Sequence, residues 1–548
     1  MSANDSKPVK SPAASAFALS YLSFLVSTPL SRLPAYPFLL STARLIKLQN
    51  TAIYTMQSTK SIALARTLRG ACRAPSHTVR RYTTTTRTIT PASLITRQQL
   101  QHQNQPQYQT TLTRLPQTQP QTRHYASTPS SSTTPLLRTP LHALHVAHNA
   151  KLVPFGGFEM PVQYGNLSVS ESHLFTRAHA SLFDVSHMVQ RVFSGPGAAP
   201  FLERVTPAGV RALAPGRSTL AVLMTEDGSG GIVDDLMVTR LEGEGRFYVV
   251  TNAACREKDD EYFRREVEKW NGEVKGEGLG VVEERWGREG LIALQGPEAE
   301  EILGEVLAEG EELNLRKLVF GQSAFARVKM SGGGVSSPVL ISRGGYTGED
   351  GFEISILGEE TVGVTEALLE AGGPEKVQLA GLGARDSLRL EAGLCLYGHD
   401  LSETTTPVDA SLRWIVSKKR RTADAGYYGA EVISKQFEAT HRGLPGPERR
   451  RVGLIVEGAP AREGAKIVSP AEEGKESVEV GVITSGCPSP TLGKNIAMGY
   501  VDLGFHKVGR EVDVLVRGRP RKAVVAKMPF VKTKYWKGEK EVEDGSAS

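Results

Sequence analysis

Apolar and polar residues follow periodic patterns from about Thr139 onward, and these patterns predict short helices and strands in alternation. The segment TPLHALHVAHNAKLVPF (139–155) predicts a short helix that leads into a strand. GIVDDLMVTRL (231–241) and RFYVVTN (246–252) have strand composition and are joined by a Gly-containing loop, which predicts a β-hairpin. This alternation indicates a fold that mixes helices and sheets.

Three later segments predict further elements that surround this hairpin in the chain. GAAPFLERV (197–205) predicts a helix that is entered through two glycines. Asn252 stands where an N-cap belongs, ahead of the predicted helix REKDDEYFRREVEKW (256–270). A third helix is expected through GARDSLRLEAGL (383–394).

The pattern changes near Arg449 to short alternating strands that are separated by Gly and Pro turns. Such spacing predicts a small antiparallel barrel or sandwich. KMPFVKTKYW (527–536) is expected to end the last strand, so that Tyr535 and Trp536 either flank a ligand or plug the barrel. We therefore place domain boundaries at 138–425 for the α/β region, which consists of two interleaved subdomains, 426–448 for a linker that carries a helix, and 449–537 for the barrel.

Residues 1–137 have a different composition from the rest of the 548-residue chain. They contain fifteen of the 65 basic residues and one of the 59 acidic ones, so the remaining residues have a formal charge of −8. An Arg-rich, Ser-rich and nearly acid-free segment is typical of a transit peptide, which predicts a mitochondrial matrix protein with a disordered leader. A disordered tail without targeting function is the alternative. Residues 538–548 are expected to form a second disordered tail.

The charge and cysteine patterns exclude several classes of protein. Because the net positive charge lies in the leader, it does not indicate nucleic-acid binding by the folded part. AFALSYLSFLV (16–26) is about half as long as a membrane span, so no membrane attachment is expected. The four cysteines are widely spaced, without a CxxC motif, which fits a reducing compartment.

The strand 231–241 contains two adjacent acidic residues, Asp234 and Asp235. Successive residues of a strand point to opposite faces, so at least one of these carboxylates must point into the protein or into a cleft. A buried carboxylate is costly unless it is partnered or used in chemistry. A turn or cap acid at the end of the strand is the structural alternative.

A glycine-rich segment, GGYTGEDGFE (344–353), surrounds Tyr346 and ends at Glu353. The glycines allow a flat ligand to approach closely, and Glu353 can accept a pair of N–H donors from a heterocycle. The structural alternative for this segment is a tight hairpin with a surface glutamate. On the predicted helix 383–394, Arg385 and Arg389 have the spacing of one helical face, and each can bind a carboxylate or form an ordinary salt bridge.

Motifs for other kinds of catalysis are absent from the sequence. It has no HExxH, GxSxG or Walker loop, and the Gly195–Pro200 match to a dinucleotide fingerprint has Pro at the third position. His142, His145 and His148 share a broad helical face without a neighbouring carboxylate, and we interpret them as surface or packed residues rather than metal ligands. No metal, flavin or NAD is expected.

Ten sequence blocks, taken in order, closely resemble the aminomethyltransferases, or T-proteins, of the glycine cleavage system, in their mitochondrial form. The resemblance covers about Thr139 to Trp536. Its blocks are FGGFEMPVQY, SLFDVSHM, GGIVDDLMV, YVVTNA, ALQGP, GYTGEDGFEIS, ARDSLRLEAGLCLYGHD, RVGLIVEGAP, TSGCPSP and KMPFV. The resemblance implies an α+β, three-domain, cloverleaf-like folate-binding fold with a C-terminal antiparallel β-barrel, in which tetrahydrofolate enters a central channel.

The resemblance also implies a reaction. Family members transfer the methylene carbon of the aminomethyl group on lipoylated H-protein to tetrahydrofolate, giving 5,10-methylenetetrahydrofolate, ammonia and dihydrolipoyl H-protein. The essential aspartate of the family matches Asp235. The substrate and folate contacts match Glu353, Arg385, Tyr535, Tyr346, Met188 and Asn252. A monomer is expected from the family, and the basic clusters 418–421 and 449–451 either receive the acidic H-protein or are solvated linker charges.

Three alternative functions can be compared with the sequence. A folate-binding assembly protein for iron–sulfur maturation would carry a Lys-Gly-Cys-Tyr type segment, where this chain has RGGYTGEDG (343–351). The folate half of a flavin-linked demethylating dehydrogenase would need several hundred more residues. A catalytically inactive T-protein scaffold that binds only folate and H-protein is compatible with the sequence.

Overall fold

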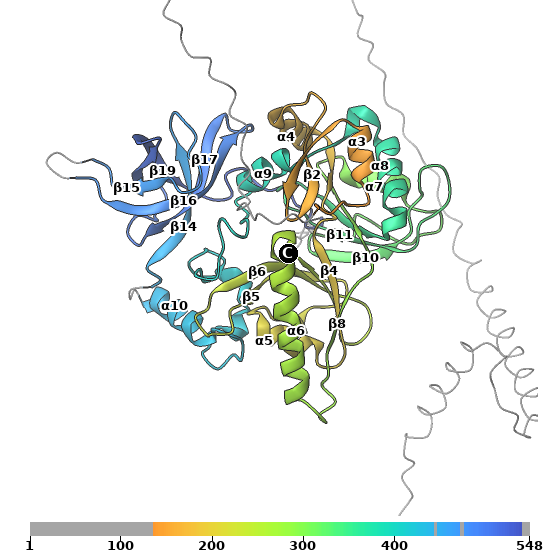
Figure 1. Cartoon of the computed structure of the whole chain (residues 1–548), viewed down its shortest axis with the longest axis horizontal. Helices are drawn as coiled ribbons and strands as arrows, with labels where there is room; N and C mark the ends of the chain where they lie inside the picture. Colours follow the sequence, from red (N-terminus) through yellow and green to blue (C-terminus); the bar gives the residue numbers. More distant parts are fainter. Residues whose placement is uncertain (1–134, 443–445, 472–475, 540–548) are drawn as a thin grey trace, which may run out of the picture. The chain divides into compact units, whose positions relative to one another are not determined.

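The computed structural model describes residues 135–442, 446–471 and 476–539. These residues form helices, two large sheets, a hairpin and a closed barrel (Figure 1), so the predicted α+β class and C-terminal barrel are confirmed. Most of the predicted leader and of the predicted tail lie outside the described residues. Within the described ranges, no helix is both long and apolar enough to cross a membrane.

The first large sheet has six strands in the order β10-β11-β12-β9-β3-β13. All neighbours are antiparallel except β13, which runs parallel to β3. One face packs against two helices, α7 and α8. The elements are β3 (Ala180–Asp184), β9 (Gly290–Gln295), β10 (Gln322–Ala326), β11 (Val339–Arg343), β12 (Gly351–Ile356), β13 (Val377–Leu379), α7 (Ala299–Val306) and α8 (Thr361–Lys376).

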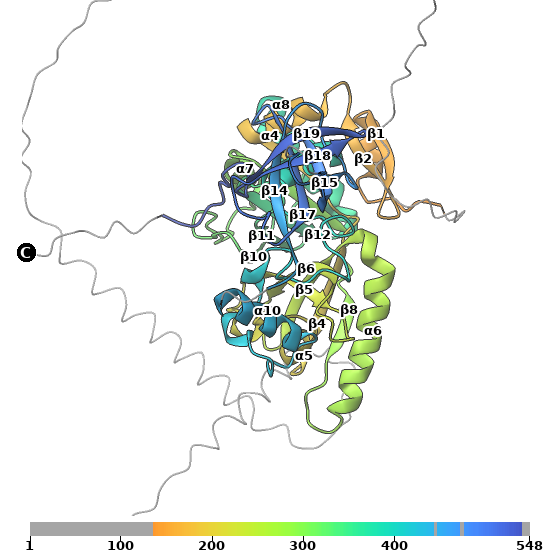
Figure 2. The same ribbon diagram turned by 90° about the vertical axis from the view of Figure 1, so that its left-hand side faces the viewer.

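The second sheet has five antiparallel strands in the order β5-β6-β7-β4-β8. The predicted hairpin forms β6 and β7, and the helices α5 and α6 pack on one face of the sheet. Figure 2 shows α6 lying along one side of this sheet. The elements are β4 (Val189–Ser194), β5 (Ser218–Met224), β6 (Ile232–Arg240), β7 (Arg246–Thr251), β8 (Val282–Arg285), α5 (Ala198–Val205) and α6 (Arg256–Glu273).

The two sheets meet through the faces that these helices leave free. Ala293 of β9 and Leu340 of β11 pack in one apolar cluster with Tyr248 and Val250 of β7. The helix α9 (Leu382–Glu391) contributes Ala384 to the same cluster. Side chains of β6 and β12 that point to this shared face therefore lie between the two sheets.

The residues after α9 form a third apolar core beside β5 and β6. The predicted linker 426–448 contains α10 (Ala430–Arg442), and its Tyr427, Ile433 and Phe437 are buried in this core. The described residues also contain short 3-10 turns, namely η2 (Val210–Ala212), η3 (Ala253–Cys255), η4 (Gly358–Glu360), η5 (Arg413–Ile415) and η6 (Lys418–Arg420). Of these, η3 directly precedes α6 and η4 directly precedes α8.

The C-terminal strands close into a six-stranded antiparallel barrel in the order β14-β17-β16-β15-β18-β19, drawn in blue in Figure 1. Alternate residues fill its interior with Val, Ile, Leu and Ala side chains. The strands are β14 (Arg449–Val456), β15 (Lys466–Val468), β16 (Glu479–Ser489), β17 (Lys494–Asp502), β18 (Glu511–Val516) and β19 (Arg519–Ala526).

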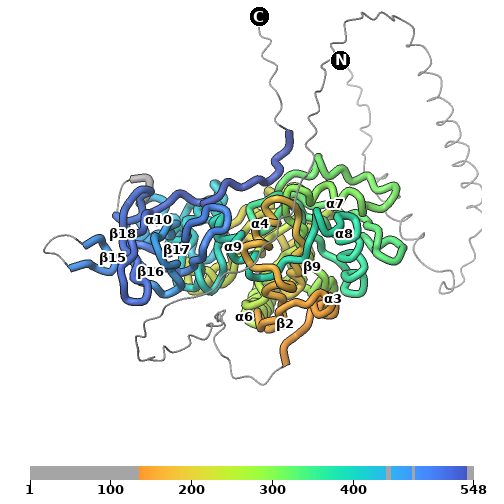
Figure 3. The backbone as a smooth tube through the Cα atoms, turned by 90° about the horizontal axis from the view of Figure 1, so that it is seen from above, coloured from red at the N-terminus to blue at the C-terminus, as the bar shows by residue number. Residues whose placement is uncertain are grey.

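The segment 527–538, which we name the C-terminal strap, corrects one prediction. It does not extend the last strand, and Tyr535 and Trp536 do not plug the barrel, because β19 ends at Ala526 and the strap then runs to the six-stranded sheet region (Figure 3). Lys534 N–H donates to the Gly348 carbonyl at 2.8 Å, and Phe320 N–H donates to the Trp536 carbonyl at 2.8 Å.

The N-terminal elements pack against the core of the first sheet and against α9. The predicted helix and strand are present as α3 (His142–Ala147) and β1 (Ala150–Phe155), and β1 pairs with β2 (Phe158–Tyr164). His145 is fully buried and bonds to Asp184 at 2.8 Å and to Tyr164 at 2.9 Å. Among the three histidines of this segment it is thus a packed residue, as interpreted from the sequence. The premise that no carboxylate lies near these histidines is wrong, because His145 bonds to Asp184 and His142 lies 3.0 Å from Glu159.

A buried carboxylate, Glu391, joins the barrel to the first sheet region. It accepts hydrogen bonds from Arg177 of α4 (Val169–Ala178) at 2.8 Å, and from the Thr491 hydroxyl at 2.8 Å and backbone N–H at 3.1 Å. His173 and Ser489 are also within hydrogen-bonding distance. Burial would raise the pKa of Glu391, but the bonds from His173, Ser489 and Arg177 outweigh it and lower this pKa to about 2.

Replacing Glu391 by Gln is expected to lower the free energy of unfolding by about 3 kcal/mol at pH 7, because it removes one partner of a buried ion pair. The folded-state pKa lies below the ordinary 4.5, so the stabilisation is present above about pH 5 and is lost as the pH falls toward 2. Urea unfolding at several pH values measures this. Glu431→Gln, on the exposed face of α10, is the control, and equal stability of both variants at pH 7 would contradict the assigned role.

Candidate active site

The two adjacent acids of β6 point to opposite sides of the second sheet. Asp234 is fully buried on the face that packs against α6, and its cross-strand neighbour Leu223 belongs to that core. Asp235 is partly accessible on the other face, where Met237 packs in the cluster between the two sheets. Both residues lie within the strand, so the alternative of a turn or cap acid is wrong.

Asn252 connects the two carboxylates at the end of β7. Its backbone N–H donates to Asp234 Oδ2 at 3.0 Å, and its Nδ2 donates to Asp234 Oδ1 at 2.9 Å and to Asp235 Oδ1 at 3.0 Å. Asn252 occupies the N-cap position of η3, the 3-10 turn that leads into α6, but its side chain makes no cap hydrogen bond and is used by the acids instead. Its amide thus fixes the orientation of the Asp235 carboxyl.

The carboxyl group of Asp235 ionises with difficulty. Burial raises the pKa of Asp235 to about 7, and the charges of Asp234 and Asp400 add to this effect, whereas the hydrogen bond from Asn252 opposes it. A carboxyl group with a pKa near neutrality can both accept and return a proton at physiological pH.

The glycine-rich loop between β11 and β12 is anchored by Gln295, at the end of β9, the strand that pairs with β12. Gln295 Nε2 donates to the Gly344 carbonyl at 2.9 Å, and the Thr347 hydroxyl donates to Gln295 Oε1 at 2.8 Å. Gly345 has a φ of +155°, and a Cβ atom there would lie 1.9 Å from Gln295 Oε1. Only glycine allows this close approach, which determines the direction of the next residue, Tyr346.

Tyr346, Arg385 and Glu353 come together from three separate elements. The Arg385 guanidinium lies 4.8 Å from the centre of the Tyr346 ring, and the Tyr346 hydroxyl donates to the Cys395 carbonyl. Glu353 of β12 points away from Phe352 and Ile354, whose side chains fill the core beneath α7 and α8. It therefore points to the face shared by the two sheets.

The charges of this group interact. Burial raises the pKa of Glu353, and the Arg385 charge acts in the opposite direction. Burial lowers the pKa of Arg385, while Glu353 and Tyr346 raise it. Within the described part of the chain, Arg385 Nη1 is buried and has no hydrogen-bond partner. A donor left unpaired next to an aromatic ring and a carboxylate is suited to bind a polar ligand.

Arg389, one helical turn after Arg385, has a structural role. It bonds to Asp386 at 3.0 Å and to Asp400 at 2.8 Å, and it donates to the Ser485 hydroxyl of the barrel at 3.0 Å. The sequence left ligand binding and salt bridges open for both arginines. The structure places Arg389 in salt bridges and leaves a free N–H group on Arg385.

Tyr535 lies on the C-terminal strap, beside the glycine-rich loop. Its ring stacks on Phe320 with centroids 4.2 Å apart, and burial raises the pKa of Tyr535 to about 12. Met188 is partly buried at the edge of the cluster between the sheets. The structure thus groups Asp235 with Asn252, and Tyr346 with Arg385 and Glu353, and electrostatic interaction between Tyr346 and Asp235 links the two groups.

His187 was not predicted as a site residue, although it directly precedes Met188. It is buried between the rings of Phe155 and Phe158, and burial lowers its pKa to about 4, with Arg385 and Arg256 acting in the same direction. His187 is therefore neutral at physiological pH. A sequence offers no signal for such a residue, because its partners are distant in the chain.

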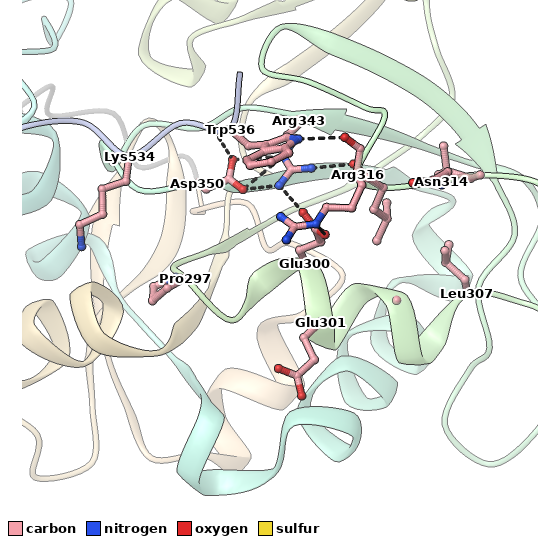
Figure 4. Close-up of a pocket in the computed structure, with 13 residues that line it drawn as sticks. Pro297, Glu300, Glu301, Leu307, Asn314, Arg316, Arg343, Asp350, Lys534 and Trp536 are labelled. Carbon is pink, nitrogen blue, oxygen red and sulfur yellow. Dashed lines mark hydrogen bonds and ion pairs between the residues drawn. The ribbon is translucent and has the colours of Figure 1, made fainter. Parts of the chain in front are cut away.

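The open hollow of about 520 Å³ shown in Figure 4 lies elsewhere, next to α7 and the C-terminal strap. Arg343 at its base bonds to Asp350, Glu300 and two backbone carbonyls. The seven predicted site residues do not line it. Because the guanidinium of Arg343 is fully paired, Arg343 is not available to bind a ligand in this hollow.

Arginines of the two basic clusters, 418–421 and 449–451, donate hydrogen bonds to backbone carbonyls of the fold. Arg420 donates to the Thr206 and Ala208 carbonyls at 2.8 and 2.7 Å, and Arg451 is buried and donates to the Ala410 carbonyl at 2.8 Å. Lys418 and Lys419 are exposed. Most of the arginines in these clusters therefore hold backbone in place.

Comparisons with known proteins identify a family for both parts of the chain. The family model of the GCVT N-terminal domain matches residues 141–420, and that of the glycine cleavage T-protein C-terminal barrel domain matches residues 449–532. A probable mitochondrial aminomethyltransferase of Schizosaccharomyces pombe is 45% identical over 415 residues, which are 76% of this chain and 97% of that protein. The mitochondrial aminomethyltransferase of Homo sapiens is 45% identical over 401 residues, 73% of this chain and 91% of that protein.

A solved structure is also similar. The crystal structure of the glycine cleavage system aminomethyltransferase T from Bartonella henselae matches with a TM-score of 0.62 and 37% sequence identity. The match covers 73% of this chain and 99% of that one. Sequence and structure thus point to the same family.

Replacing Asp235 by Asn is expected to raise the melting temperature above pH 7, because the fold disfavours the ionised carboxyl group. Since the folded-state pKa lies above the ordinary 3.8, the contribution of Asp235 to stability is present below about pH 4 and is lost as the pH rises through 7. In calorimetry from pH 5 to pH 8, the melting temperature of the variant should rise relative to that of the parent as the pH increases. Asp502→Asn, on the barrel surface, is the control, and a pH-independent difference would contradict the prediction.

Proposed function

Since this chain belongs to the glycine cleavage T-protein family and is an aminomethyltransferase, we propose that its substrates are tetrahydrofolate and the aminomethyl group on lipoylated H-protein. The products are 5,10-methylenetetrahydrofolate, ammonia and dihydrolipoyl H-protein. The protein works in the mitochondrial matrix, as a monomer. Homology to proteins that are named mitochondrial supports the location.

Asp235 is the catalytic residue in this proposal. In the transfer, two folate nitrogens each lose a proton and bond to the methylene carbon, while the C–S bond breaks to give a thiol and the C–N bond breaks to give ammonia. A carboxyl group with a pKa near 7 can take a proton from an attacking nitrogen and stabilise positive charge on the carbon. The hydrogen bond from Asn252 keeps the carboxyl in position.

The other predicted residues bind the folate. The Glu353 carboxylate accepts paired N–H donors of the pterin ring, and Tyr346 offers a flat surface beside it. Arg385 has an unpaired N–H group for an anionic or carbonyl group of the folate. In this proposal Met188, Asn252 and Tyr535 complete the folate site. The observation that carries the proposal is that Asp235 of β6 and Glu353 of β12 point to the space between the two sheets, while Arg385 of α9 and Tyr346 of the glycine-rich loop pack against each other and interact with these acids.

Replacing Asp235 by Asn is expected to reduce 5,10-methylenetetrahydrofolate formation about 100-fold or more, because general acid–base catalysis contributes at least this much. In the parent, the rate should fall below about pH 7, as Asp235 becomes protonated. The assay uses aminomethyl-lipoyl H-protein and tetrahydrofolate, with Asp502→Asn as the control. A parent that binds tetrahydrofolate but never turns over would support the scaffold alternative instead.

Replacing Glu353 by Gln is expected to raise the KM for tetrahydrofolate about tenfold or more, with a smaller change in kcat, because the amide removes a charge-assisted acceptor for the pterin. Steady-state kinetics and calorimetric titration with tetrahydrofolate measure the effect. Glu359→Gln, an exposed residue near the end of the same strand, is the control. An unchanged KM would remove Glu353 from the folate site.

A further inference from the structure

A third acid lies behind the pair on β6, on the buried side of α6. This helix is highly charged, but its buried residues are Asp259, Tyr262, Phe263 and Glu266, which share one face at helical spacing, and the buried Cys255 directly precedes the helix. Asp259 is 0% exposed. Among the residues that the structure describes, neither carboxyl oxygen of Asp259 has a hydrogen-bond partner. A buried carboxylate without a donor is costly, so this acid requires an explanation.

Asp259 interacts directly with Asp234, and the Thr251 hydroxyl also lies beside Asp259, where it opposes the rise of the Asp259 pKa. Two buried carboxyl groups in contact cannot both be ionised, so one of them holds a proton. Asp234 already accepts two N–H groups from Asn252, at 3.0 and 2.9 Å, so both of its carboxyl oxygens act as acceptors. The proton therefore resides on Asp259, which can use it to donate a hydrogen bond to Asp234.

The surrounding charges are compatible with a neutral Asp259. Arg191 of β4 faces it and by itself would favour ionisation, but Arg191 is paired with Asp260 at 2.6 Å and with Glu283 at 2.9 Å. The other titratable groups around the three acids are Cys255, Lys258 and Asp400. Burial raises the pKa of Asp259 to about 9, and the charge of Asp234 adds to this effect.

We propose that Asp259 is a positioning residue that, as a protonated acid, donates a hydrogen bond to Asp234, so that Asp234 holds Asn252 and Asn252 orients Asp235. This inference rests on the proposed catalytic role of Asp235. The chain of contacts crosses the sheet, from α6 through β6 and the end of β7 to the face between the two sheets.

The donor function has a consequence for Asp235. Without a donor at position 259, Asp234 loses a hydrogen bond that fixes its carboxyl group, so it holds Asn252 less firmly. Asn252 then orients the Asp235 carboxyl group less well, which lowers the rate of the chemical step.

Two substitutions in the full chain separate this role from simple packing. Asp259→Asn keeps an N–H donor toward Asp234 and is expected to retain the parental kcat within about threefold. Asp259→Leu removes the donor and is expected to lower kcat about tenfold or more, with the KM for tetrahydrofolate within about twofold. Glu257→Gln, exposed on the same helix, is the control.

Infrared spectroscopy of the parent and of Asp259→Asn at neutral pH tests the protonation directly and does not depend on activity or on the folding of the leucine variant. Loss of a protonated-carboxyl band in the variant supports the inference, and loss of an ionised-carboxylate band overturns it. Equal damage by Asn and Leu, or full activity of the Leu variant, also overturns it. If Asp235→Asn remains fully active, the proposed function fails, while the infrared result still decides the state of Asp259.

Discussion

The alternation of side chains along β6 is the constraint on which the site depends. Because successive residues point to opposite faces, Asp234 and Asp235 are adjacent in the chain but occupy separate environments. One carboxyl lies in the core beneath α6, and the other points to the space between the two sheets. Asn252 reaches both because it ends the neighbouring strand of the same hairpin. A shift of register by one residue would exchange the two acids and abolish the arrangement.

The remaining site residues depend on contacts between parts of the chain that are far apart in sequence. Gln295 anchors the loop that carries Tyr346, and the C-terminal strap binds the same loop from its other side through Gly348. Glu391, at the end of the helix that carries Arg385, is bonded to the barrel. The barrel thus contributes to the site by holding α9 and the loop in place, while the charged groups of the site come from the two sheets and α9.

The sequence predicted the elements whose stabilising contacts are local. The β6–β7 hairpin, the helix 383–394 and the barrel strands are present because their apolar periodicity matches the burial found. The periodicity also predicted the outward direction of Glu353 relative to Phe352 and Ile354. The sequence did not show that the Asn252 side chain bonds two carboxylates instead of capping the turn that it begins. It also failed for the strap, because the partners of the strap, Gly348 and Phe320, are about two hundred residues away.

Asp259 is another residue whose burial the sequence analysis did not predict. In the sequence it is one acid within a run of charged residues, and nothing in its composition separates it from its exposed neighbours. Its helical spacing from Cys255, Tyr262 and Phe263 places it on the apolar face, where a charge is costly. A charged residue type at a core position is the pattern expected where stability is sacrificed for function. The raised pKa of Asp235 reflects the same cost, because the fold holds that carboxyl group where its ionised form is disfavoured.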